Sequence, residues 1–424
     1  MQHQRPSLQK AIRLRNAVAL YASSVLGSGV LVLPGLTAKI AGPGSILAWA
    51  ALSLASYPFA YTFASLSARR PESGGIYSFA KESFGFRVGT VIGWLFALWI
   101  LTGAPAVTLI AASYLGYAFP LNRAETYVLA FAIILAAFTI NYRGIVVSNK
   151  VQFAVIASIV ALLLATIFAS ASLVRLKDFT PFLPNGYLAI GTAAALIFWS
   201  YLGYENTSNV AEEFENPEKD FHRSIILSVI LISFLYLAVS FVTIGTLAYQ
   251  AGGSVAPFAA ILSNVLGKYG AQGTALLAVF IIFGTVNAYT TGMSRVIYAL
   301  ARDGGFPRVL AHINPKTNVP DRVLFTFLGS FIIVLIVYYF SQVDLETALL
   351  IPSGAAIINY VVGSAAGVKI LGAQGNRDRK KLLFPLASFV ISLIVLPFVG
   401  PLLLVSVAVG AGAFAYVSVL KRAS

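Results

Sequence analysis

Residue types that commonly catalyse reactions or bind metal ions are few in this chain and lie far apart. The sequence has no cysteine, and its histidines, His3, His222 and His312, show no spacing that would bring two of them to one metal ion. No cluster of histidine, aspartate or cysteine places a nucleophile beside a base, and no Walker-type loop is present for ATP. The sequence therefore argues against an enzyme, a metal centre or a cofactor, and against ATP as an energy source.

Two polar stretches inside apolar segments carry the chemistry that the sequence does offer. Gly27, Ser28 and Gly29 interrupt the first segment, and a polar run at residues 200–207 interrupts another. Helix breaks leave backbone N–H and C=O groups without partners, which is costly in hydrocarbon unless these groups line a cavity or meet a ligand. Free N–H groups suit a carboxylate and free carbonyl oxygens suit an ammonium group, so the breaks predict a site for a small zwitterion. The alternative is that the glycines only allow helices to pack closely.

The candidate ligands flank these breaks. We expect the carboxylate at the N–H groups of Ser28, Gly29 and Val30, where glycine lets a ligand approach the backbone closely. We expect the ammonium group at carbonyl oxygens on the other ends of the breaks. The residues that this second expectation places around the ammonium group are Ala22, Ser23, Trp199 and Leu202, and Ser200 is a further candidate for binding the substrate.

Glu205 lies about 18 residues into its apolar segment. Ionisable groups at such a depth are expensive and are commonly functional. Glu205 is therefore a candidate for proton coupling, neutral at rest and exchanging a proton as the site opens. The alternative is a structural role, in which its carboxyl group satisfies the unwound backbone of the first segment.

The chain that carries these residues has a strongly apolar composition. Hydrophobic residues make up 58% of the 424 and charged residues only 10%, with a mean hydropathy of +0.84, whereas soluble domains use about a quarter charged residues. A spanning helix needs about 20 apolar residues, which predicts an all-α integral membrane protein with about twelve spans, at 12–37, 43–67, 88–117, 124–141, 151–173, 187–211, 224–249, 273–301, 323–341, 346–367, 382–397 and 401–420. The last two are separated by three residues, which favours a tight helical hairpin over one kinked span.

The basic residues alternate between dense and sparse loops. With the N-terminus in the cytoplasm, 24 fall on cytoplasmic segments and 5 on outer ones, which accounts for all 29. This positive-inside pattern predicts a multi-pass protein of the cytoplasmic (inner) membrane, with both termini in the cytoplasm. We expect no cleavable signal peptide, because the polar, basic N-terminal stretch runs into a long apolar segment that lacks a small-residue cleavage site. The net charge of +14 is then a topology signal facing anionic membrane lipid, and it does not indicate nucleic-acid binding.

The two breaks stand in corresponding places in two halves of the chain. Gly27 and Gly203 are 176 residues and five predicted spans apart. Because five is odd, the second segment enters the membrane in the opposite direction to the first. Such an inverted repeat, with a broken first helix in each copy, is typical of transporters whose substrate site lies at the midplane.

The chain resembles the amino acid–polyamine–organocation (APC) superfamily of transporters in four stretches, which are SSVLGSGVLVLPG (23–35), RRPESGGIYSFAKESFG (69–85), FWSYLGYENTSNVAEEFENPEKDFHRSI (198–225) and SRVIYALARDGGFPRVLAHINPKTNVP (294–320). Its size and the stretch LTGAPAVTLIAASYLGYAFP (101–120) are most similar to bacterial exporters of methionine and branched-chain amino acids, and WSYLGYE is similar to arginine/agmatine antiporters. The resemblance implies a LeuT-like fold with helices one and six broken. Its parts are a cytoplasmic segment at 1–11, inverted five-helix repeats at 12–173 and 187–367, two C-terminal helices at 382–420, and a cytoplasmic tail at 421–424.

The resemblance also assigns side chains to the substrate pocket. Trp199 matches an aromatic gate that closes over the substrate in this superfamily, although tryptophan is also a common packing residue. Tyr289 matches an aromatic residue that lines the pocket of the antiporters. Ala104 takes the position of an antiporter asparagine that helps to hold a guanidinium group, so a neutral substrate is favoured.

The coupling ion stays open. Many proton-coupled relatives carry a lysine in the fifth span, and the span at 151–172 here has none. Sodium would instead need oxygen ligands. The candidates are the hydroxyls of Thr291 and Ser294 with backbone carbonyls near Val25 and Leu26.

Together these features predict a secondary active transporter that moves neutral, apolar L-amino acids by alternating access, coupled to protons or to exchange. The alternative is a cationic amino acid or polyamine antiporter. A channel fits less well because no charged ring or repeated filter motif is present. The expected partners are the amino acid, a coupling proton or Na⁺ and membrane lipid, and a homodimer is one open assembly state.

Overall fold

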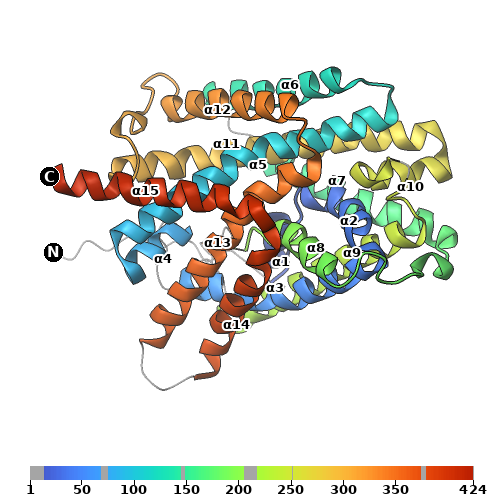
Figure 1. The fold of residues 1–424 in the computed structure, drawn as a ribbon, viewed down its shortest axis with the longest axis horizontal. Helices are drawn as coiled ribbons and strands as arrows, with labels where there is room; N and C mark the ends of the chain where they lie inside the picture. The colour runs from blue at the N-terminus through green and yellow to red at the C-terminus, as the bar shows by residue number, and fades with distance from the viewer. Residues whose placement is uncertain are drawn as a thin grey trace.

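The computed structural model describes residues 14–67, 75–144, 149–204, 217–250, 252–373 and 379–423. Within these ranges the regular structure is entirely helical, and nine helical segments are long and apolar enough to cross a membrane. Most of the long helices run along the horizontal axis of Figure 1, with α13 and α14 inclined to it. The prediction of an all-α, multi-pass membrane protein is therefore confirmed.

The first apolar segment is interrupted at residues 26–28, between α1 (Leu14–Val25) and α2 (Gly29–Ala41). This is the place where glycine and serine predicted a break. After α2 the chain reverses through a short 3₁₀ turn, η1 (Gly42–Gly44), into α3 (Ser45–Ser67). Gly42 has a φ of +59°, a left-handed conformation that glycine adopts without steric cost.

The second interrupted segment begins as α8 (Leu188–Ile197) and tightens into a 3₁₀ turn, η4 (Phe198–Tyr201). Leu202 then takes an extended conformation, and Gly203 has a φ of +122°. The helix thus ends inside the span predicted at 187–211. Glu205 and the rest of that span lie outside the described residues.

The other long helices follow the predicted spans closely and are α5 (Phe86–Ala118), α6 (Arg123–Tyr142), α7 (Asn149–Ser170), α9 (Pro217–Gly245), α11 (Lys268–Arg302), α12 (Asp321–Phe340), α13 (Leu345–Gly372), α14 (Arg379–Val395) and α15 (Leu403–Ala423). Short 3₁₀ turns lie at η2 (Ala171–Leu173), η3 (Leu176–Phe179), η6 (Gly253–Val255), η7 (Arg308–Leu310) and η8 (Leu396–Leu402). Two further helices were not predicted, α4 (Gly75–Phe84) and α10 (Pro257–Leu266). Each has 10 residues, too few for a search based on about 20 apolar residues to detect.

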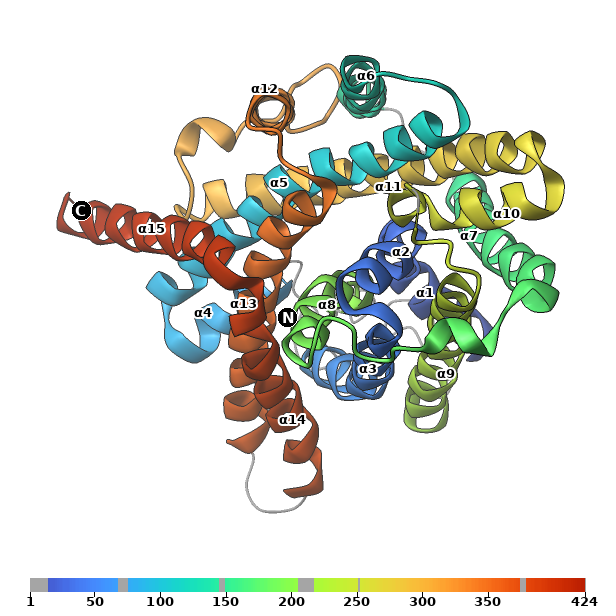
Figure 2. The same cartoon turned by 45° about the vertical axis from the view of Figure 1, so that its right-hand side comes forward.

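The interrupted helices lie together in one bundle. In Figure 2, α1, α2, α3, α8 and α9 form a compact group, and α5 and α11 pass beside it. Helix α5 packs against both α11 and α13, while α6 and α12 lie on the outer side of the α5–α11 pair. The two breaks are consequently enclosed by other helices on the inside of the molecule.

The C-terminal helices separate after their turn. Gly400 in η8 has a φ of +68°, which reverses the chain between α14 and α15. Helix α14 packs on α13 and α3, whereas α15 packs on α5, and the two diverge in Figure 2. The predicted reversal is present, but its helices have different partners and do not pack as a tight pair. The turn itself rests on α8, where a Cβ atom on Gly191 would overlap the ring of Phe398.

Candidate functional site

The two helix breaks are joined by one tyrosine. The hydroxyl of Tyr236, on α9, lies 3.0 Å from the carbonyl oxygen of Val25 and 3.0 Å from that of Ser200. Tyr236 is fully buried, with Trp49 and Tyr201 packed edge-on against its ring. The end of α1 and the end of η4 therefore share a single hydrogen-bond donor. Sequence reasoning missed Tyr236, although a tyrosine within an apolar span generally needs a polar partner for its hydroxyl.

Polar groups without partners also lie at the two breaks. The hydroxyls of Ser28 and Ser200 are buried and have no hydrogen-bond partner among the described residues. A Cβ atom on Gly29 would lie 2.7 Å from the Ser200 hydroxyl and 2.8 Å from Cδ1 of Trp199, so the two breaks are in direct contact. Gly29 and Val30 begin α2, and the first turn of a helix leaves N–H groups without intrahelical acceptors. This cluster has the donors that a carboxylate needs.

Trp199 extends from this cluster to α5. Its side chain is buried, and a Cβ atom on Gly103 would lie 2.6 Å from Cη2 of the indole. Trp99 packs edge-on against the ring with centroids 6.2 Å apart. Ala104, the next residue of α5, is also buried. The absence of a side chain at Gly103 is what gives the indole its place.

A cavity of about 280 Å³ opens beside the first break. Leu26 and Gly27 border it on one side, and the remaining walls are mostly apolar residues of α7 and α11. Tyr289 is one of these wall residues. The structure thus brings Tyr289 to the same cavity as the first break.

A second cavity, of about 410 Å³, continues from the first. Gln152, Asn287, Ala288 and Gly292 line both cavities. The second is bounded by the end of α6, by α11 and by the loop at 303–320 between α11 and α12. It lies towards the face that the charge pattern predicts to be cytoplasmic.

The four predicted sodium ligands are not gathered around one cavity. Thr291 and Ser294 line the second cavity, on which neither Val25 nor Leu26 borders. The Thr291 hydroxyl lies 2.5 Å from Oδ1 of Asn141 and 2.8 Å from the Asn287 carbonyl oxygen, and Ser294 donates to the Thr291 carbonyl oxygen at 3.0 Å. These hydroxyls already have protein partners.

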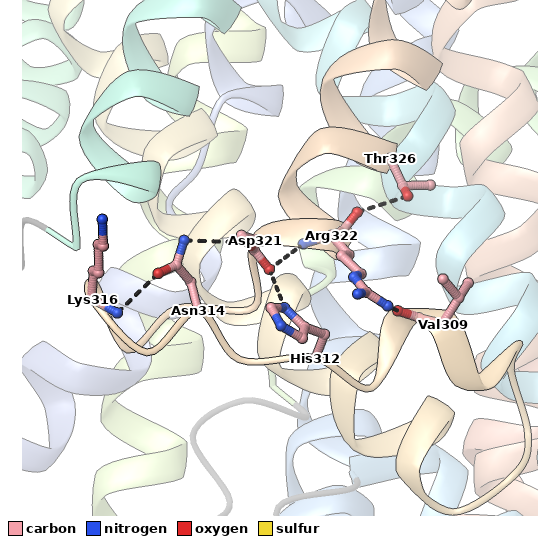
Figure 3. Close-up of polar contacts among 7 residues, drawn as sticks. All are labelled: Val309, His312, Asn314, Lys316, Asp321, Arg322 and Thr326. Atoms are coloured by element: carbon pink, nitrogen blue, oxygen red, sulfur yellow. Dashed lines mark hydrogen bonds and ion pairs between the residues drawn. The ribbon is translucent and has the colours of Figure 1, made fainter.

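The carboxylate of Asp321 joins several hydrogen bonds of the loop at 303–320, as Figure 3 shows. Nδ1 of His312 lies 2.7 Å from Oδ1 of Asp321, and Nδ2 of Asn314 donates to Oδ2 at 3.3 Å. The backbone N–H of Arg322 also donates to Asp321, and its guanidinium donates to the carbonyl oxygen of Val309. Asp321 therefore holds the loop that forms a wall of the second cavity.

The remaining predicted site residues lie around the breaks. The carbonyl oxygen of Ala22 accepts from the N–H of Leu26 at 2.8 Å, and that of Trp199 accepts from the N–H of Leu202 at 3.4 Å. Ser23 belongs to α1, and its side chain lies outside the described part of the chain. Among the described residues, no group of three or more His, Cys, Asp or Glu side chains could hold a metal ion.

Comparison with known proteins agrees with this architecture. A family model described as amino acid permease matches residues 12–420. The chain is 36% identical to the uncharacterized amino acid permease YecA of Bacillus subtilis over 87% of each chain. It is 28% identical to the L-methionine/branched-chain amino acid exporter YjeH of Escherichia coli, over 86% of this chain and 87% of that protein. It is also 28% identical to the branched-chain amino acid permease BcaP of Bacillus subtilis, over 74% of this chain and 72% of that protein. The chain therefore belongs to the amino acid permease family within the APC superfamily, and it is a membrane transporter of amino acids, not an enzyme.

Proposed function

We propose that this protein is a secondary active transporter that carries neutral, apolar L-amino acids across the cytoplasmic membrane by alternating access. The observation that carries the proposal is the contact between the two interrupted helices. Their facing ends hold two buried hydroxyls, those of Ser28 and Ser200, with no partner among the described residues. Buried polar groups are normally hydrogen-bonded, and the position of this pair at the contact between the two breaks supports a ligand there.

In this proposal the carboxylate binds the N–H groups of Gly29 and Val30 together with the hydroxyl of Ser28. The positive end of the α2 dipole favours an anion there. The ammonium group faces the backbone around Leu202, where the 3₁₀ turn ends. The carbonyl oxygens of Val25 and Ser200 contribute less, because the Tyr236 hydroxyl lies 3.0 Å from each.

The substrate side chain then meets apolar walls. Trp199 closes one side of the site as its gate, with Ala104 on α5 and Tyr289 on α11 as further walls. The described residues that border the 280 Å³ cavity include no acidic side chain, so a cationic substrate would meet no anionic partner there. The exporter and the permease of branched-chain amino acids among the relatives support the same substrate class.

The proposed topology has twelve spans in two inverted repeats. Two of the nine apolar segments, Gly29–Leu66 and Leu382–Val419, have 38 residues each and reverse at Gly42 and Gly400. Counting each as two spans, joining α1 to α2 and adding the short α8 gives twelve. Both termini are then cytoplasmic, in agreement with the distribution of basic residues. Energy would come from a proton gradient through Glu205, from Na⁺ or from exchange.

A counterflow experiment tests the proposal. Purified protein in proteoliposomes loaded with unlabelled amino acid should accumulate labelled leucine and methionine well above alanine and arginine. The Gly29→Val variant is a matched control, because its side chain would overlap Ser200 and Trp199 and should abolish accumulation. A clear preference for arginine would contradict the proposed substrate class, and flux at channel-like rates would contradict a carrier.

A further inference from the structure

The two cavities meet at one buried amide, that of Asn287. Asn287 is only 5% exposed, yet it borders both the 280 Å³ cavity beside the first break and the 410 Å³ cavity beyond it. It lies on α11, two residues before the proposed pocket residue Tyr289. The function proposed above gives Asn287 no role.

The orientation of this amide is fixed by a neighbour on another helix. Nδ2 of Asn141, on α6, donates to Oδ1 of Asn287 at 2.9 Å and to the carbonyl oxygen of Ala137 at 2.9 Å. Oδ1 of Asn141 in turn faces the hydroxyl of Thr291. Because Asn141 presents a donor, Asn287 must present its oxygen to it.

The Nδ2 group of Asn287 therefore points away from Asn141, and it donates no hydrogen bond to any described residue. An amide NH₂ group carries two donors, and Nδ2 of Asn287 is not among the fully buried polar atoms without partners, so these donors reach the space of the cavities. The group belongs to a side chain that is almost fully buried but borders both cavities. An acceptor supplied by a ligand would satisfy it.

The surroundings select an anionic acceptor. None of the described residues that border the two cavities is acidic, and Arg295 adds positive charge to the second one. The Arg295 guanidinium donates to the carbonyl oxygen of Thr291, one turn from Asn287, which keeps it on this wall. A cation would meet donors and a like charge at this position.

We propose that Asn287 binds the substrate carboxylate on its route between the first helix break and the predicted cytoplasmic opening. Leu26 and Gly27 border the same cavity as Asn287, so the carboxylate that leaves the N-terminus of α2 meets the Asn287 amide next. Asn141 is the positioning residue, since it turns the Asn287 donors towards the cavities. This inference rests on the proposed transport of amino acids.

The test compares Asn287→Leu with Thr285→Val, a matched control in the same cavity whose hydroxyl already donates to its own helix at the Ile281 carbonyl oxygen. Labelled leucine is supplied from one face at a time to proteoliposomes containing oriented protein. Loss of a hydrogen bond to a charged group corresponds to about tenfold or more in affinity. We expect Asn287→Leu to raise the KM from the predicted cytoplasmic face by that factor, and Thr285→Val to leave it within about twofold.

Competition with leucinol, which has a hydroxymethyl group in place of the carboxylate, separates recognition from a structural effect. Asn287→Leu should weaken inhibition by leucine and leave inhibition by leucinol unchanged. If Asn287→Leu does not fold, Asn287→Ser replaces it in the same experiment. If the Asn287 variants and Thr285→Val have equal KM values, the inference is wrong, and water alone would bind the Asn287 amide. Failure of the wild-type protein to transport any amino acid would instead overturn the proposed function.

Discussion

At the scale of single residues, the proposed site combines side chains that make hydrogen bonds at the helix breaks with side chains whose hydroxyls have no partner there. The hydroxyl of Tyr236 lies within hydrogen-bond distance of a carbonyl oxygen at each break, whereas the hydroxyls of Ser28 and Ser200 have no partner among the described residues. The first arrangement fixes the backbone, and the second leaves polar groups for a ligand. Two substitutions test these roles separately.

Tyr236→Phe should destabilise the protein by about 1–3 kcal/mol, because it leaves two buried carbonyl oxygens without a donor. Thermal unfolding of the detergent-solubilised protein measures the change. The control is Tyr338→Phe on α12, since the buried Tyr338 hydroxyl has no hydrogen-bond partner among the described residues. If both variants unfold at the same temperature, Tyr236 does not tie the breaks together.

Gly103→Ala should impair transport by displacing Trp199. The new Cβ atom would lie 2.6 Å from Cη2 of the indole, closer than packed atoms can approach. Gly273→Ala, on α11, is the control, because its Cβ atom would meet no other heavy atom within 4 Å. Leucine counterflow should fall several-fold in Gly103→Ala only, and the double variant with Trp199→Phe should recover part of it. If the double variant recovers no transport, the effect of Gly103→Ala does not depend on the indole of Trp199.

At the scale of elements, the sequence predicted the interrupted helices better than the contacts between them. Gly27, Ser28 and Gly29 are poor helix formers in close succession, so the break at 26–28 was visible in the sequence. Helices α4 and α10 were missed because each is half the length of a spanning helix. The hydrogen bond between Asn141 and Asn287 joins residues 146 positions apart, and no local pattern predicts such a pair.

The carboxylate of Asp321 contacts two side chains of the loop between α11 and α12, those of His312 and Asn314. Asp321→Asn should loosen residues 309–320, because the neutral amide weakens the contacts with His312 and with the N–H of Arg322. Hydrogen exchange of the backbone amides, followed by mass spectrometry, should show faster exchange there. Asp178→Asn is the control, since the Asp178 side chain makes no hydrogen bond or ion pair with the described residues. Unchanged exchange would mean that the loop is held by other contacts.

At the scale of the whole molecule, the fold class followed from composition, and the arrangement of helices around the site did not. An apolar fraction of 58% and regularly spaced basic loops were sufficient to predict a multi-pass helical protein. That α14 and α15 would diverge onto different partners depends on the φ of one glycine and on side-chain packing, which composition cannot supply.

The proposed topology can be tested directly because the chain contains no cysteine. Single substitutions Lys316→Cys and Lys177→Cys, both at exposed positions, should react with a membrane-impermeant maleimide from opposite faces. In intact cells only the Lys177→Cys variant should be labelled, and in inverted vesicles only Lys316→Cys. Labelling of both from the same face would contradict the three spans predicted between residues 177 and 316.

The contact between the ring of Phe398 and the backbone of Gly191 connects the turn between the last two helices to α8. The aromatic ring rests on the backbone of α8 at Gly191, and α8 leads directly into η4, which carries Trp199, the proposed gate. Shortening the chain before α14 would strip this support and let lipid tails reach the flank of the broken segment. We therefore expect α14 and α15 to stabilise the position of α8 through Phe398. Because a methyl group added at residue 191 would overlap the Phe398 ring, Gly191→Ala should displace α8 and disturb the proposed substrate site.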